Sequence, residues 1–128
     1  IIDDDPDFVE STKELLETQN YDVDVAYDGE SGYKKAMDSD PDALILDVMM
    51  RTKTEGFDIA RKIADTPKLK QKPVVMLTGI REQMGLGYGF QPDEDWLPVS
   101  TVLEKPVDPT KFIDTIRELL RKREEETE

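Results

Sequence analysis

The sequence contains neither cysteine nor histidine among its 128 residues. The absence of cysteine excludes a disulfide framework, a thiolate nucleophile and a cysteine-based zinc site. The absence of histidine removes the imidazole group as a metal ligand or as a base. Any chemistry that this chain performs must therefore use carboxylates, hydroxyls, lysine and arginine.

Long apolar runs and an excess of positive charge are also lacking. No apolar stretch approaches the roughly 20 residues that a membrane-spanning helix needs, and residues 1–5 resemble neither a signal peptide nor a transit peptide. The 30 acidic and 17 basic residues give a formal charge of −13, which repels a phosphate backbone and offers no counterion release. We therefore expect a cytoplasmic protein with no membrane insertion and no direct contact with nucleic acid.

A chain of this length with 37% apolar residues fits one compact domain. We predict that residues 1–120 form this domain and that the charged residues 121–128 are a tail or the start of a linker. The chain begins in an apolar pair without an initiator methionine, which suggests a domain cut from a longer protein or a start lost to disorder.

Short apolar segments rich in β-branched residues alternate with longer segments of helical periodicity. This alternation is typical of βαβ units, so we expect an α/β fold with a single doubly wound parallel sheet flanked by helices. The segment Ala43–Leu46 is apolar without interruption, as in a central strand that is buried on both faces. Five strands are predicted, at residues 1–2, 23–26, 43–46, 73–77 and 101–104.

The longer segments carry apolar residues at the three-to-four spacing of one helical face. Asp5 can cap the first helix, with Pro6 at its first position, and Asp108 and Pro109 can start the last helix in the same way. Three glycines and two prolines between residues 80 and 98 interrupt the fourth helix and leave an irregular region there. The other helices are predicted at residues 6–19, 29–38, 57–64 and from 109 onward.

Polar side chains stand where the predicted strands end. Asp3 and Asp4 follow the first strand, and Asp47 follows the third. Thr78 follows the fourth strand and Lys105 the fifth. Ligands of open α/β sheets bind beyond the carboxyl ends of the strands, and converging carboxylates repel one another unless a cation joins them. Because oxygen ligands with room for water and a phosphate suit Mg²⁺, the sequence predicts a magnesium site at this edge.

The chemistry of these groups points to phosphoryl transfer. An aspartate can attack phosphorus as a nucleophile, and positive charge must meet the oxygens of the transferring group. Lys105 and Mg²⁺ supply that charge, while the Thr78 hydroxyl can donate a hydrogen bond to a phosphoryl oxygen.

Four short motifs occur in order at the ends of predicted strands: Ile-Ile-Asp-Asp at 1–4, Leu-Ile-Leu-Asp at 44–47, Met-Leu-Thr-Gly at 76–79 and Glu-Lys-Pro at 104–106. Together they resemble the receiver domain of bacterial response regulators. The resemblance implies a flavodoxin-like sheet of strand order 2-1-3-4-5 and phosphorylation of Asp47 by a histidine kinase or a phosphotransfer protein. It also implies a protein-interaction surface that switches on phosphorylation, and a possible covalent link to a kinase or effector domain.

The resemblance also implies a role for each of the other site residues. Asp4 is expected to ligate Mg²⁺ directly, and Asp3 largely through water. The backbone carbonyl of Met49 is expected to be a further ligand. Thr78 and Lys105 are expected to contact the phosphoryl group.

Three other functions would use similar residues. A phosphatase or phosphotransferase with an aspartyl-phosphate intermediate needs a second carboxylate, often two residues after the nucleophile, where this chain has Met49. A flavodoxin-like cofactor binder needs a Ser/Thr/Gly-rich phosphate loop after the first strand, which is missing. A receiver-like scaffold without phosphorylation does not need the intact acids, Thr78 and Lys105. We therefore expect a signalling phosphoacceptor whose only activities are its own phosphorylation and dephosphorylation.

Overall fold

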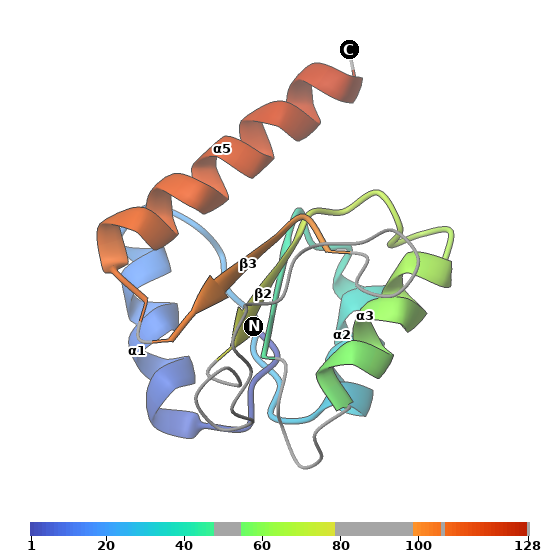
Figure 1. Cartoon of the computed structure of the whole chain (residues 1–128), viewed down its shortest axis with the longest axis horizontal. Coiled ribbons are helices and arrows are strands. Elements are labelled where there is room, and N and C mark those ends of the chain that lie inside the picture. Colours follow the sequence, from blue (N-terminus) through green and yellow to red (C-terminus); the bar gives the residue numbers. More distant parts are fainter. Residues whose placement is uncertain (48–54, 79–98, 106, 128) are drawn as a thin grey trace, which may run out of the picture.

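Figure 1 shows the computed structural model of the chain, in which a parallel sheet lies between two pairs of helices. The structure describes residues 1–47, 55–78, 99–105 and 107–127, with residues 124–127 as helix backbone only. The predicted irregular region at 80–98 and the predicted ligand Met49 lie outside these ranges. Within the part of the chain that the structure describes, no helix is long and apolar enough to cross a membrane.

In the described ranges, three strands form the regular part of the sheet. They are β1 (Leu44–Asp47), β2 (Val74–Thr78) and β3 (Thr101–Glu104), which pair in parallel in the order β1-β2-β3. Every residue of β1 and β2 is buried, as expected for central strands covered on both faces. These strands correspond to the third, fourth and fifth predicted strands.

Each of the first two predicted strands joins the sheet through a single bridged residue, Ile2 in the first and Ala26 in the second. Ile2 forms a parallel bridge to Ala26 on one side and to Leu46 on the other. The Asp47 N–H donates to the Ile2 carbonyl at 2.9 Å, and the Asp3 N–H donates to the Ala26 carbonyl at 3.1 Å. The order across the sheet is therefore the predicted 2-1-3-4-5. The regular pairing of the predicted strand at 23–26 is limited to Ala26, so this strand is shorter than expected.

Among the described residues, four helices cover the sheet, and Figure 1 shows α1 and α5 on one face and α2 and α3 on the other. One apolar cluster joins one sheet face to α2 and α3, and a second joins the other face to α1 and α5. Gly32 in α2 allows a close approach to the first strand, since a Cβ at this position would lie 2.5 Å from the Ile2 side chain. The helices are α1 (Pro6–Glu17), α2 (Gly29–Ser39), α3 (Glu55–Asp65) and α5 (Pro109–Thr127).

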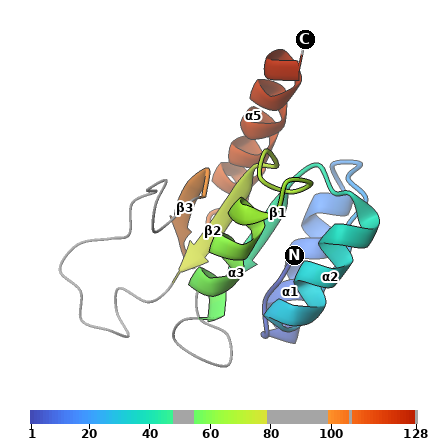
Figure 2. The same ribbon diagram turned by 90° about the vertical axis from the view of Figure 1, so that its right-hand side faces the viewer.

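Side-chain caps fix the helix starts. The Asp5 carboxylate accepts from the N–H groups of Asp7 and Phe8 at 3.2 and 3.4 Å, as predicted for the first helix. The Asp108 carboxylate accepts from the Thr110 N–H at 3.3 Å at the start of α5. At its other end α5 continues through the predicted tail and projects past the sheet (Figure 2).

Candidate functional site

Three carboxylates meet at the carboxyl edge of the sheet. Asp47 ends β1, and the pairing of Ile2 with Leu46 brings Asp3 and Asp4 beside it. One carboxylate oxygen from each of Asp3, Asp4 and Asp47 lies within 4.8 Å of the others. Asp3 and Asp47 are buried, whereas Asp4 is exposed. The structure therefore brings together all three acids that the sequence assigned to a metal site.

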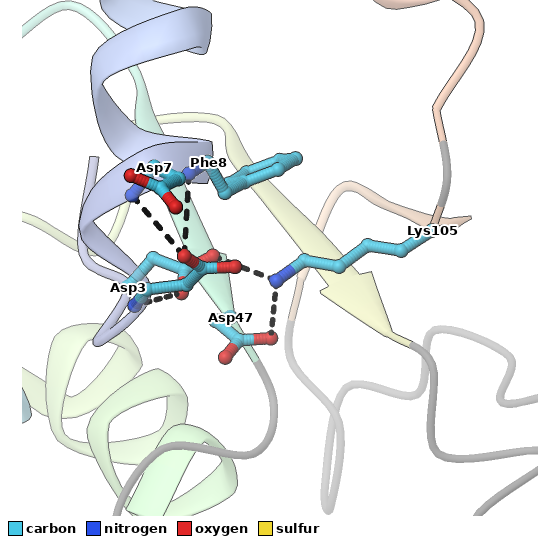
Figure 3. A network of polar contacts seen from close by, with 6 residues as sticks. Asp3, Asp7, Phe8, Asp47 and Lys105 are labelled. Carbon is cyan, nitrogen blue, oxygen red and sulfur yellow. Dashed lines mark hydrogen bonds and ion pairs between the residues drawn. The ribbon is translucent and has the colours of Figure 1, made fainter.

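Lys105 reaches this cluster from the end of β3. Its Nζ lies 2.8 Å from Asp3 Oδ2 and 3.4 Å from Asp47 Oδ1, and Figure 3 shows the side chain extended between the two carboxylates. The Lys105 backbone N–H donates to the Thr78 carbonyl at 2.8 Å, which ties the residue to the end of β2. One ammonium group thus lies between two buried acids.

Asp3 and Asp4 differ in what surrounds them. Asp3 Oδ1 accepts from the Asp5 N–H at 3.0 Å, while its Oδ2 accepts from Lys105. Both oxygens of this buried side chain are therefore engaged by protein groups. The exposed Asp4 carboxylate is open to solvent, where a hydrated cation can reach it.

The burial of these charges shifts the pKa of Asp47 and of Lys105. Burial, followed by the negative charge of Asp3, raises the pKa of Asp47 to about 7, although Lys105 opposes the shift. Burial alone would lower the pKa of Lys105, but the hydrogen bond to Asp3 and the charge of Asp47 outweigh it and raise this pKa. The cluster carries more negative charge than one ammonium balances, so a further cation would favour the ionised form of Asp47. The oxygen donors and the charge fit a hard divalent metal ion.

Of the other predicted site residues, Thr78 lies within the described part of the chain and Met49 does not. Thr78 is the last residue of β2, is buried, and is paired in register with Glu104 at the same sheet edge. Met49 lies outside the described residues, as do Gly79 and Pro106 of the sequence motifs.

One aromatic side chain at this site was not predicted from the sequence. The ring centroid of Phe8, in the first turn of α1, lies 4.3 Å from Lys105 Nζ (Figure 3). The available signal was its spacing, because the third residue after the Asp5 cap lies in the helical turn next to the acids.

A cavity of about 750 Å³ lies elsewhere, among residues that include Val23, Asp42 and Leu120. Its lining contains none of Asp3, Asp4, Asp47 and Lys105. The cluster of acids is therefore separate from this cavity.

A parallel α/β sheet with acids and a lysine at its carboxyl edge belongs to the class of flavodoxin-like domains that bind charged ligands at strand ends. The family model described as the response regulator receiver domain matches residues 1–117. This chain belongs to the response regulator receiver domain family, which confirms the resemblance found in the motifs.

Two curated relatives match 95% of the chain. The DNA-binding dual master transcriptional regulator RpaA of Synechocystis sp. is 33% identical over 122 residues, and the transcriptional regulatory protein CpxR of Escherichia coli K12 is 34% identical over 123 residues. The match covers 48% of each relative, so the chain spans about half their length.

A solved structure supports the fold. The chemotaxis protein CheY4 of Vibrio cholerae has a TM-score of 0.73 and 24% sequence identity, over 92% of this chain and 93% of that one. This similarity confirms the predicted fold class.

Proposed function

We propose that this domain accepts a phosphoryl group on Asp47 from a histidine kinase or a phosphotransfer protein, with Mg²⁺ bound at the same site. Phosphorylation then switches a protein-interaction surface in a two-component pathway. The observation that carries the proposal is the position of Asp47, which is buried beside Asp3 and Asp4 and lies 3.4 Å from the ammonium of Lys105.

The proposed reaction makes one bond and breaks one. A carboxylate oxygen of Asp47 attacks phosphorus, the bond from phosphorus to the donor breaks, and the donor leaves with the electron pair. The product is a mixed anhydride on Asp47. Lys105 balances the negative charge of the transferring group, and we assign the Thr78 hydroxyl a hydrogen bond to one of its oxygens.

The chain's own groups would hold the metal ion in this proposal. Asp4 and Asp47 supply direct carboxylate ligands, Asp3 acts largely through water, and the Met49 carbonyl adds a further oxygen. Bound Mg²⁺ supplies positive charge at the phosphoryl group. The hydrogen bonds that occupy both oxygens of Asp3 favour this indirect role.

The proposal includes partners beyond the described chain. Both relatives are named as transcriptional regulators, and since the chain spans about half of each, a linked effector or kinase domain is part of the proposal. So are a cytoplasmic location and an activity limited to the domain's own phosphorylation and dephosphorylation.

Intact mass spectrometry tests the phosphoacceptor. After incubation with Mg²⁺ and acetyl phosphate, we expect the wild-type chain to gain one adduct of roughly 80 Da, the mass of a phosphoryl group. Asp47→Asn should gain none because an amide cannot form the anhydride, whereas the exposed Asp38→Asn should match the wild type. An adduct retained in Asp47→Asn would show that another residue is phosphorylated. A wild-type chain that gains no adduct would favour an interaction scaffold.

Removal of the Asp4 carboxylate should weaken metal binding. We expect Asp4→Asn to lower the affinity for Mg²⁺ by roughly ten-fold or more, since even outer-sphere partners of metal ions contribute 10- to 100-fold. Isothermal titration calorimetry of the unphosphorylated chain measures this loss. Asp7→Asn removes an exposed acid from the first turn of α1, close to the cluster but not part of it, and serves as the matched control. Equal affinities of the two variants for Mg²⁺ would show that Asp4 is not a ligand of the metal ion.

A further inference from the structure

The ring of Phe8 is an uncharged neighbour of the Lys105 ammonium group. Lys105 Nζ lies 4.3 Å from the ring centroid, within the distance of a cation–π interaction. We propose that Phe8 is a positioning residue, which holds the Lys105 ammonium between Asp3 and Asp47 and so keeps it ready to meet the phosphoryl group. This inference rests on the proposed function of the same site.

The cap of α1 sets the position of the ring. Asp5 Oδ1 accepts from the Phe8 N–H at 3.4 Å, and the Asp5 N–H donates to Asp3 Oδ1 at 3.0 Å. One residue therefore fixes both the helical turn that carries Phe8 and the carboxylate that pairs with Lys105. Phe8 is half-buried and also packs against the apolar cluster under α1 and α5. Its ring thus packs against the core while it contacts the ammonium.

An uncharged partner has a property that the two carboxylates lack. The charge on Asp47 changes when it is phosphorylated, and a metal ion competes with Lys105 for the carboxylates. The attraction of an aromatic face for an ammonium does not depend on either event. The ring therefore restricts the lysine side chain, which is 24% exposed, while its ionic partners are exchanged.

Three replacements of Phe8 separate this electrostatic role from packing. Phe8→Leu keeps an apolar side chain but has no ring, and Phe8→Trp keeps an aromatic face. Incorporation of 3,4,5-trifluorophenylalanine at position 8 keeps the shape of the ring but removes its negative face. Leu15→Ala is the matched control, because Leu15 lies on the same helix and packs against the same cluster.

The first readout is the initial rate of phosphorylation by acetyl phosphate with Mg²⁺, far below saturation. We expect the leucine and trifluorophenylalanine variants to react about 2- to 5-fold more slowly than the wild type, the range that corresponds to a partly exposed cation–π contact. Phe8→Trp and Leu15→Ala should react at the wild-type rate. If Phe8→Leu fails to fold, the trifluorophenylalanine variant still decides the question. Wild-type rates for both ring-altered variants would overturn the inference and leave the proposed function intact.

The second readout needs neither metal nor phosphoryl donor. In the metal-free chain, a ring stacked over the ammonium should shift the NMR signals of the Lys105 ε-methylene protons upfield. Phe8→Leu should return them to their ordinary positions. Unshifted signals in the wild type would overturn the inference about Phe8, whether or not the chain accepts a phosphoryl group. Failure of the chain to accept a phosphoryl group would count against the proposed function alone.

Discussion

Asp47→Asn is expected to make the metal-free domain more stable at pH 8, by about 2 kcal/mol, although it removes the proposed phosphoacceptor. The Asp47 carboxylate is buried and lies in the same cluster as Asp3 and Asp4. Burial and the charge of Asp3 raise its pKa from 3.8 to about 7. Above pH 7 the folded domain must therefore hold a charge that its surroundings disfavour, and the amide removes that charge.

The pKa of Asp47 also sets the direction of the pH dependence. Because the pKa is raised on folding, the folded domain holds a proton between about pH 4 and pH 7 that the unfolded chain has lost. The contribution of Asp47 to stability therefore declines as pH rises through this window, by at most about 4 kcal/mol. We expect Asp47→Asn to recover about half of this free energy, since the amide must also be buried and loses the contact with Lys105.

Urea denaturation of both proteins in EDTA, from pH 4.5 to 8.5, measures this effect. The other carboxylates add a common slope, so the quantity to follow is the difference in unfolding free energy between Asp47→Asn and the wild type. It should be small near pH 4.5 and grow toward pH 8. Asp38→Asn removes an exposed charge from α2 and should change the free energy by less than about 0.5 kcal/mol. A difference that does not vary with pH would show that Asp47 titrates normally in the folded domain.

Local sequence patterns were sufficient to predict most of the fold. The apolar run of β1 and the caps Asp5 and Asp108 specify their elements through short-range physics, and the structure has these elements close to their predicted bounds. The strand at 23–26 was predicted too long, because the lateral pairing of a strand depends on residues distant in sequence, here Ile2 with Ala26. The course of α5 beyond residue 120 was left open by the sequence, and there Arg123 pairs with Asp42 at 3.2 Å, a contact between distant segments.

The residues of the site were predictable, but their interactions were not. Strand ends of a parallel sheet meet at one edge, so the positions of Asp3, Asp47 and Lys105 followed from the order of the elements. Lys105 and Asp3 are 102 residues apart in sequence, and the burial that raises the pKa of Asp47 arises only when the helices pack. The contact of Phe8 with Lys105 has the same origin, since it requires α1 and the end of β3 to lie together.

Lys105→Met is expected to destabilise the metal-free domain by about 2 to 3 kcal/mol at pH 8. Lys105 lies within ion-pair distance of both buried acids, and removal of one partner of a buried ion pair leaves an uncompensated charge, which costs about 3 to 5 kcal/mol. We expect somewhat less because the lysine side chain is 24% exposed. The pKa of Lys105 lies above the ordinary 10.5. Its stabilising contribution is therefore complete at pH 8 and is lost only as pH rises above 10.5 and through the raised pKa of the folded domain.

A double-mutant cycle identifies which acid carries this cost. In the Asp47→Asn background the lysine has one buried partner fewer, so Lys105→Met should cost at least about 1 kcal/mol less there than in the wild type. Arg61→Met is the control for an exposed ion pair, because Arg61 Nη2 lies 3.0 Å from Asp58 Oδ1 and both side chains are exposed, at 46% and 62%. An ion pair of this kind contributes about 0 to 1 kcal/mol. Equal costs for the Lys105 and Arg61 substitutions, measured by urea denaturation in EDTA, would show that burial of Asp3 and Asp47 does not strengthen their interaction with Lys105.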